Sequence, residues 1–262
     1  MILLVNGCSF SYGDELPDVN KRYSTYLGKY LNLDVKNIAW PGSSNERIWR
    51  TTKAALYEIT DISKVFVMWS DLARVENVHL EANMATYHVS PNYVKETNNP
   101  LYDENGKFIL NDPFFQFSPA RLDTMPWKVL KSEYEDYYSK IYNTETGISK
   151  TFFYMYDILM TCKILNIDYY QGFFHEGNRY AIDKTFNQFN MNVKGSRLQR
   201  VKDYYNKYLQ LFKGNQRIGF DSGSFTFNEF VTENKLDRMP QGHPGPKAHK
   251  AYAKYLFDNF MR

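Results

Sequence analysis

The sequence predicts an α/β fold in which helices cover both faces of a parallel sheet, with residues 1–262 forming a single domain. Two observations carry this prediction. Residues 2–5 and 65–69 are short, continuous apolar runs, which are typical of parallel strands buried on both faces. The segments between them carry apolar residues at helical spacing, so strand and helix alternate as β-α-β-α-β. This alternation implies a parallel sheet with right-handed crossovers.

The first third of the chain gives these elements in order. Residues 2–5 form the first strand, residues 35–39 the second and residues 65–69 the third. Ser43 and Glu46 have the spacing of a capping box, which predicts the start of the helix before the third strand. The apolar faces of the two intervening helices are Tyr23, Leu27, Tyr30 and Leu31 in the first and Ile48, Thr52, Ala55, Leu56 and Ile59 in the second.

The alternation is interrupted after the third strand. Residues 71–147 are rich in turn formers, which predicts a long ordered insertion in this single domain. Beyond it, the pattern predicts a helix over residues 149–165, a fourth strand over 168–174 and a C-terminal helix over 246–260. A further helix is predicted between these last two elements, from the apolar stripe of Leu198, Val201, Tyr205, Tyr208 and Phe212.

Composition limits the classes of protein to consider. Hydrophobic residues make up 43% of the chain and charged residues 23%, as in an ordinary globular protein. The net charge is +3 and the basic residues are scattered, so we expect no nucleic-acid partner. No apolar run approaches the roughly 20 residues of a membrane-spanning helix, so we expect no membrane partner. The two cysteines, Cys8 and Cys162, and the lack of a signal-peptide pattern predict a cytoplasmic location.

A candidate nucleophile follows the first strand. Ser9 lies in the glycine-containing segment 7–14, and ligands of open parallel sheets bind at the carboxyl ends of the strands. Small residues at this position let the backbone turn sharply and present a hydroxyl group. A structural alternative remains open, because Ser9 or Ser11 would also serve as an ordinary helix cap.

Two further segments bring candidate groups toward the same edge. Gly42 follows the second strand and precedes a helix N-terminus, where a backbone N–H suits a developing oxyanion; a plain turn at Pro41 and Gly42 is the alternative. His243 lies just before the C-terminal helix, although His249 on that helix is a second candidate. The other three of the five histidines show no metal-ligand spacing, so we expect no metal site.

Taken together, these three segments resemble the SGNH/GDSL hydrolase family. The sequences of residues 6–14 and 242–244 look most like those of a divergent branch of the family, found in tailed bacteriophages and some bacteria. The resemblance implies a three-layer, flavodoxin-like fold without a cofactor. It also implies that Ser9 is the nucleophile, that His243 is the base, and that the N–H groups of Ser9 and Gly42 form the oxyanion hole. Asn45 matches an asparagine that often follows this glycine in the family.

Two positions depart from the family pattern. Ser70 stands at the end of the third strand, where the family has an asparagine that completes the oxyanion hole. Its neighbour Trp69, together with Arg74 and Glu76, is a candidate to line the pocket; a buried Trp69 and a surface Arg74–Glu76 ion pair are the alternative. Pro240 stands where the family has its catalytic aspartate.

Asp237 is the nearest carboxylate upstream of His243 and the expected third member of the site. Otherwise a backbone carbonyl would hold the ring and leave a Ser-His dyad. The resulting hypothesis is a serine esterase that cleaves a small O-acyl ester, for which an acetylated glycan is a candidate. The alternative is a degenerate member of the family that serves as a binding or virion assembly module. The insertion over residues 71–147 would suit either role, as a lid or as a partner surface.

Overall fold

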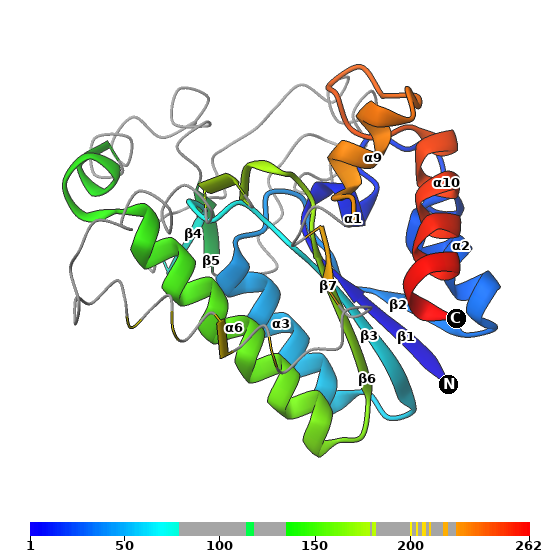
Figure 1. The fold of residues 1–262 in the computed structure, drawn as a ribbon, viewed down its shortest axis with the longest axis horizontal. Coiled ribbons are helices and arrows are strands. Elements are labelled where there is room, and N and C mark those ends of the chain that lie inside the picture. The colour runs from blue at the N-terminus through cyan, green and yellow to red at the C-terminus, as the bar shows by residue number, and fades with distance from the viewer. Residues whose placement is uncertain are drawn as a thin grey trace, which may run out of the picture.

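The computed structural model describes residues 1–78, 114–117, 135–178, 180–181, 200, 203, 206–207, 210, 217–219 and 224–262. Within these residues, Figure 1 shows a twisted sheet with helices on both sides. The strands are β1 (Ile2–Asn6), β2 (Asp34–Asn37), β3 (Ile62–Trp69), β4 (Val75–Val78), β5 (Phe114–Phe117), β6 (Asp168–Phe173) and β7 (Arg217–Ile218). The α-helices are α1 (Ser9–Tyr12), α2 (Tyr23–Leu31), α3 (Asn45–Glu58), α6 (Thr144–Ile164), α9 (Phe227–Glu233) and α10 (Pro246–Leu256). Shorter helical turns are η1 (Val19–Lys21), η4 (Tyr137–Ile141) and η6 (Phe257–Met261).

The main sheet has five strands in the order β2-β1-β3-β6-β7, and every described pair in it is parallel. This is the flavodoxin-like order, in which the chain winds outward from β1 first in one direction and then in the other. The predicted three-layer α/β fold is therefore confirmed. The strands β4 and β5 form a separate antiparallel pair within the segment expected to be an insertion.

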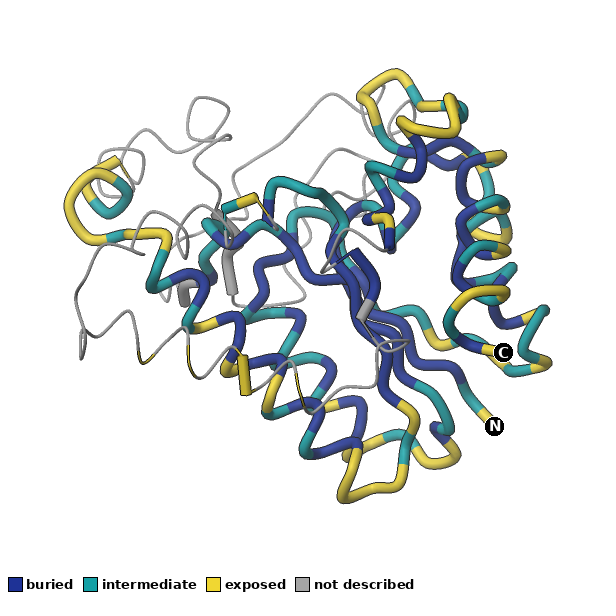
Figure 2. Tube along the Cα trace, in the orientation of Figure 1, coloured by how far each residue is buried: buried dark blue, intermediate teal, exposed yellow. Residues whose placement is uncertain are grey.

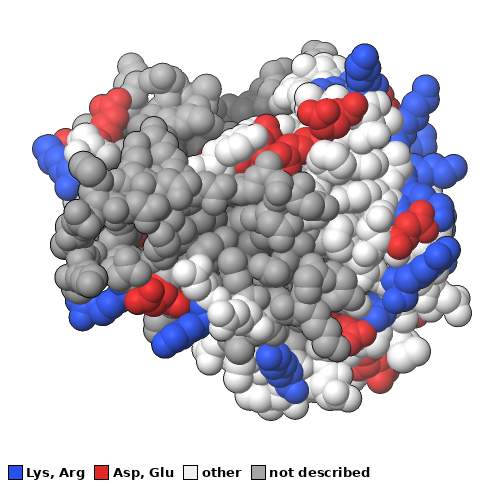
Figure 3. All heavy atoms as spheres, viewed as in Figure 1, with Lys and Arg blue, Asp and Glu red and all other residues white. Residues whose placement is uncertain are grey.

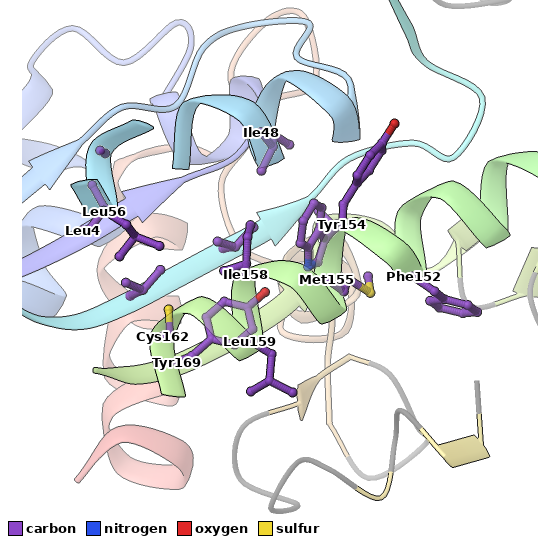
Figure 4. Close-up of a cluster of buried hydrophobic side chains, with 14 of the residues drawn as sticks. Leu4, Ile48, Leu56, Phe152, Tyr154, Met155, Ile158, Leu159, Cys162 and Tyr169 are labelled. Carbon is purple, nitrogen blue, oxygen red and sulfur yellow. The ribbon is translucent and has the colours of Figure 1, made fainter. Parts of the chain in front are cut away.

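Alternation along the strands divides the core into two layers. Val65, Val67 and Trp69 of β3 pack with α3 and α6, whereas Phe66 and Met68 pack with α2, α9 and α10. Figure 4 shows the first of these layers, with side chains of α3 and α6 meeting against the sheet. In Figure 2, β1 and β3 are buried along most of their length, which explains why they read as continuous apolar runs in the sequence.

Most predicted elements are present, with shifted boundaries. The helix expected over 149–165 begins earlier, at Thr144, and the strand expected over 35–39 is Asp34–Asn37. The capping box expected at Ser43 is wrong by one residue, because Ser44 is the N-cap of α3 and accepts a hydrogen bond from the Arg47 N–H at 3.1 Å.

Other expectations fall largely outside the described residues. Most of the helix expected from Leu198 to Phe212 lies outside them, although residues 200, 203, 206, 207 and 210 are described and helical; most of the stretch 71–147 lies outside them as well. Among the helices that are described, none combines the length and the apolar composition needed to cross a membrane.

Candidate active site

The turn after β1 is fixed by the Asn6 side chain. Its Oδ1 accepts the Gly7 N–H at 2.8 Å, and its Nδ2 donates to the Ile48 carbonyl on α3 at 3.0 Å. Gly7 has no room for a side chain, because a Cβ there would clash with Ser11 and with the Met68 carbonyl. A glycine is therefore required where the chain leaves the sheet, and the next turn begins at a defined place.

Ser9 is the first residue of α1 and is 5% exposed. The N-cap of this short helix is Cys8, which makes no side-chain cap. Ser11 is buried and its Oγ lies 2.9 Å from the Tyr23 hydroxyl, so its hydroxyl is already used in the structure. Ser9 Oγ makes no such hydrogen bond with the described residues. The expectation that either serine acts as a helix cap is therefore wrong, and Ser9 carries the available hydroxyl.

His243 lies against the loop that follows α1. Its Nδ1 is 2.7 Å from Glu15 Oε2, and the other oxygen of Glu15 accepts the Gln241 N–H at 2.9 Å. The Glu15 side chain is only 8% exposed and the His243 side chain 12%. Glu15 also adopts φ of +66°, a left-handed conformation that is uncommon for a residue with a side chain. The backbone is thus bent into an unfavourable region to aim this carboxylate at the imidazole.

The same loop folds back onto Ser9. The Ser9 carbonyl accepts the N–H groups of Gly13 and Asp14 at 2.9 and 3.0 Å. The Phe10 ring, next to Ser9 in the chain, lies 5.7 Å from the His243 ring. The His243 Nε2 is 3.9 Å from Asp14 Oδ2, and the structure has no hydrogen bond between this ring and Ser9 Oγ, although it describes both residues. His243 therefore lies beside α1, in contact with the residue next to Ser9, without a hydrogen bond to Ser9 itself.

Asp237 lies elsewhere than expected. Its two carboxylate oxygens accept the N–H groups of Lys247 and Ala248 at 3.1 and 2.7 Å, which satisfies the first turn of α10. The hydrogen bond to His243 that sequence reasoning assigned to Asp237 is made by Glu15 instead. A carboxylate is favoured at a helix N-terminus because the helix dipole is positive there, which explains the position that Asp237 adopts.

His249, the other candidate base, is a core residue. It is fully buried, stacks on Tyr23 at 5.9 Å, and accepts the Tyr23 N–H through Nδ1 at 3.0 Å. Burial lowers the pKa of His249 to about 3, with smaller contributions from the Arg22 and His243 charges. This imidazole is neutral and enclosed at ordinary pH, so it has no access to a ligand.

The loop after β2 lies directly beside the Ser9 loop. The Trp40 N–H donates to the Gly7 carbonyl at 3.2 Å, which joins the two segments at the sheet edge. Gly42 has φ of +78° and open space where a Cβ would stand, so the backbone conformation requires the glycine. Among the described residues, nothing accepts a hydrogen bond from the Gly42 N–H. This N–H therefore retains its donor capacity.

Asn45 and Ser70 are bound to each other. Asn45 Oδ1 accepts the Ser70 N–H at 2.7 Å, and Asn45 Nδ2 donates to the Ser70 carbonyl at 3.2 Å and to Thr151 Oγ1 at 3.0 Å. The amide of Asn45 is thus fully engaged in joining α3, β3 and α6, and no N–H of it remains for a ligand. Ser70 Oγ is buried and has no hydrogen-bond partner in the described part of the chain, and Asn178 donates to the Ser70 carbonyl at 2.8 Å.

Trp69 does not line a pocket. It is fully buried in the core beneath α3 and α6, where its Nε1 donates to Gln171 Oε1 at 3.0 Å. Arg74 and Glu76 do not pair with each other either. Glu76 binds Arg50, with an N–O distance of 2.9 Å, whereas the Arg74 guanidinium reaches the Ser43 carbonyl at 3.4 Å.

Charge is unevenly distributed around this edge of the sheet. Figure 3 shows acidic side chains gathered beside α9, and Lys and Arg side chains along the edge formed by α10 and α2. The described residues contain no group of three or more His, Cys, Asp or Glu side chains arranged to hold a metal ion. Cys8 and Cys162 are both free and buried.

Comparison with known proteins gives distant structural similarity only. No protein-family model matches the sequence, and no curated protein matches it. Among solved structures, one similar chain is a lipolytic protein of the G-D-S-L family from Desulfitobacterium hafniense DCB-2, with a TM-score of 0.42 and 8% identity over 97% of this chain and 96% of that chain.

Two further solved structures are distantly similar to this chain. One is a carbohydrate esterase family 2 enzyme with a carbohydrate-binding domain from Corynascus thermopiles (Myceliophthora fergusii), with a TM-score of 0.39, 11% identity and coverage of 98% of this chain and 64% of that chain. The other is an acetyl xylan esterase from Butyrivibrio proteoclasticus, with a TM-score of 0.36, 17% identity and coverage of 98% and 62%. This chain therefore spans less than two thirds of either protein. Similarity at this level assigns no activity.

Sequence reasoning missed Glu15, which immediately follows the segment 7–14 that it had singled out. The signal was present as two adjacent carboxylates, Asp14 and Glu15, directly after a glycine. What the sequence does not display is the left-handed turn at Glu15 that swings the second carboxylate toward His243.

Proposed function

We propose that this protein is a serine ester hydrolase in which Ser9 is the nucleophile and His243 the base. The observation that carries the proposal is the Glu15–His243 hydrogen bond of 2.7 Å beside the helix that begins with Ser9. A carboxylate at Nδ1 keeps the proton on that nitrogen and leaves Nε2 as the acceptor for the serine proton. Glu15 is the orienting carboxylate in this proposal, in place of Asp237.

The reaction would proceed in two steps. Ser9 Oγ attacks the ester carbonyl as its proton passes to His243, and the alcohol then leaves with that proton. Water, activated by the same imidazole, hydrolyses the acyl-serine. Negative charge on the carbonyl oxygen is held by the N–H groups of Ser9 and Gly42. Ser70 is the proposed third donor, and its buried hydroxyl would have to become accessible in the substrate complex.

The proposed substrate is an O-acyl ester, and an acetylated glycan is the leading candidate. The half-buried rings of Tyr12 and Trp40 lie 6.1 Å apart beside the Gly42 loop, with the Arg22 guanidinium over Tyr12 at 4.5 Å and the Arg47 guanidinium over Trp40 at 5.7 Å. The resemblance of the three sequence segments to SGNH hydrolases supports the same chemistry.

A fluorophosphonate probe tests the proposal directly. The wild-type protein should be labelled at Ser9, and short-chain nitrophenyl esters should be hydrolysed. Ser9→Ala and His243→Ala should abolish both labelling and turnover. Ser11→Ala is the matched control, because its hydroxyl is held by Tyr23 and should not react. Folded wild-type protein that neither labels nor turns over these esters would contradict the proposal.

A second function has one observation in its favour. Ser9 Oγ and the His243 ring are not hydrogen-bonded, as would hold in a non-catalytic member of the family that serves as a binding or assembly module. Catalytic hydrogen bonds are often long before substrate binds, so this geometry by itself does not exclude catalysis. The labelling experiment separates the two functions, since a binding module would leave Ser9 unmodified.

A further inference from the structure

Among the residues that the structure describes, Arg74 is a cation without an anionic partner, and it lies at the edge of the candidate site. Its Nε is buried and has no hydrogen-bond partner. Its only side-chain hydrogen bond to a described residue is from Nη1 to the Ser43 carbonyl at 3.4 Å, and its guanidinium lies over the Phe174 ring at 5.7 Å. Among the residues that the structure describes, Arg74 makes no ion pair. Leaving a buried N–H of a charged group unpaired is costly, and none of the described residues supplies the acceptor.

Two acidic residues close to Arg74 in the sequence, Asp71 and Glu76, form hydrogen bonds with other residues. Glu76 forms a two-bond contact with Arg50, at 3.2 and 2.9 Å. Asp71 accepts the Ala73 N–H at 2.8 Å through Oδ1. Neither of these carboxylates therefore pairs with the Arg74 guanidinium.

The position of Arg74 is close to the proposed reaction centre. Ser43, whose carbonyl it contacts, directly follows Gly42, and a second guanidinium, that of Arg47, donates to Ser43 Oγ at 3.2 Å. Asp14 and Glu15 lie by His243 instead. The site thus has a cationic side at Ser43 and an acidic side at His243, and an anionic ligand would bind in one orientation only.

The ring that Arg74 covers also leads into a pocket. Phe174 contacts Phe10, with ring centroids 5.1 Å apart, and lines a pocket of about 420 Å³ together with Asn178 and Tyr142. This volume is in the range of small-molecule sites. Asp71 lines this pocket as well, whereas Arg74 lines an adjoining, smaller pocket that shares Leu72 and Tyr142 with it, so an anionic group would be favoured on the Arg74 side.

We propose that Arg74 binds a carboxylate of the substrate, so that this protein hydrolyses acidic esters in preference to neutral ones. A guanidinium presents its N–H donors in a fork that matches the two oxygens of a carboxylate. This inference rests on the proposed esterase function and adds to it the charge of the substrate.

Matched pairs of aryl acetates test the proposal. The acids are 3- and 4-acetoxybenzoate, whose carboxylates lie at two distances from the ester, and the neutral partners are their methyl esters. Rates are divided by the uncatalysed alkaline hydrolysis rates, to remove intrinsic reactivity. We expect kcat/KM for at least one acid to exceed that of its methyl ester by about 10-fold or more.

Arg74→Gln should remove this preference, mainly through KM for the acid, and leave the methyl esters within about 3-fold of wild type. Arg74→Lys should restore part of it, because the charge is kept and the fork is lost. Arg262→Gln is the matched control, since Arg262 is exposed at the C-terminus. Equal slowing of both esters in Arg74→Gln would overturn the proposal, as would a wild-type protein without preference for either acid.

A binding measurement separates failure of this inference from failure of the esterase proposal. Binding of 3- and 4-hydroxybenzoate, the product acids, is measured by NMR to Ser9→Ala and to Ser9→Ala/Arg74→Gln. Binding that is lost with Arg74 supports the carboxylate site, even if no ester is hydrolysed. Equal affinity for both variants, or no binding to either, overturns it irrespective of turnover.

Discussion

The Nδ1 atom of His243 lies 2.7 Å from a carboxylate oxygen of Glu15, a residue 228 positions earlier in the chain. The second oxygen of Glu15 is held by the Gln241 N–H, so the carboxylate is fixed between the residue that it orients and that residue's own loop. The proposed base is therefore held by contacts from the beginning of the chain, and its function depends on the two ends of the chain folding together.

Glu15→Gln is expected to reduce kcat/KM by about 10²- to 10⁴-fold, with little change in folding. The amide adds an N–H donor near Nδ1, which favours the imidazole tautomer whose Nε2 carries the proton. That tautomer is unable to accept the serine proton. Ester hydrolysis and thermal unfolding are measured on the same preparations. Activity within 3-fold of wild type would show that Glu15 does not orient the base.

Asp237→Ala is expected to lower stability and to leave catalysis nearly unchanged, the opposite of Glu15→Gln. The variant loses the acceptor for two N–H groups at the start of α10, which should lower the free energy of unfolding by about 1 to 2 kcal/mol. The kcat of the folded fraction should change little, because Asp237 does not contact His243. Urea unfolding together with active-site titration distinguishes the two effects. A loss of kcat as large as that of Glu15→Gln would restore Asp237 to the catalytic group.

Substitutions at Gly42 test whether its N–H needs the left-handed backbone. Asn tolerates positive φ far better than a β-branched residue, and a Cβ meets no atom within 4 Å at this position. Gly42→Asn should therefore keep kcat/KM within about 10-fold of wild type, whereas Gly42→Val should lose about 100-fold or more. Comparable activity of the two variants would indicate that this N–H takes no part in the reaction.

Because His249 is buried, we expect the free energy of unfolding of the protein to fall in mild acid. Its pKa is about 3 in the folded protein, below the ordinary value of 6.5, because burial disfavours the charged form. Between pH 6.5 and 3 the unfolded chain binds a proton that the folded chain does not. Stability attributable to His249 is thus complete above pH 6.5 and falls by about 1.4 kcal/mol per pH unit below it.

The comparison variant for this effect is His249→Asn, whose Oδ1 replaces Nδ1 as the acceptor for the Tyr23 N–H. The variant should be less stable at neutral pH, because it leaves a cavity, but its free energy of unfolding should decline less steeply from pH 6.5 to 4. Urea unfolding at several pH values measures both slopes. If the free energy of unfolding of the wild type and of His249→Asn declined equally with pH, the effect would not come from His249.

The fold was predictable because its signals are local. Buried strands such as β1 and β3 read as continuous apolar runs, and the helices between them read as periodic stripes. Trp69 follows the same local pattern. It lies on the same face of β3 as Val65 and Val67, so strand alternation places it with them in the layer beneath α3 and α6 rather than in a pocket.

The site was only partly predictable, for a different reason. Which side chain a given N–H or imidazole meets depends on backbone geometry that sequence spacing does not encode. Asp237 is close to His243 in the sequence but caps a helix, whereas Glu15 is distant in the sequence and contacts the ring. Two features at Glu15, a left-handed residue and a contact across most of the chain, lie beyond what local pattern reading detects.

Three of the hydrogen bonds that join the segments at this sheet edge are made between uncharged groups. Asn6 ties β1 to α3, Asn45 ties α3 to the end of β3, and the Trp40 N–H binds the Gly7 carbonyl. Such contacts are short-range and are not screened by dissolved ions, unlike the approach of a charged ligand. Ionic strength should accordingly alter how fast an acidic compound reaches Arg74 while leaving the framework around Ser9 and Gly42 unchanged.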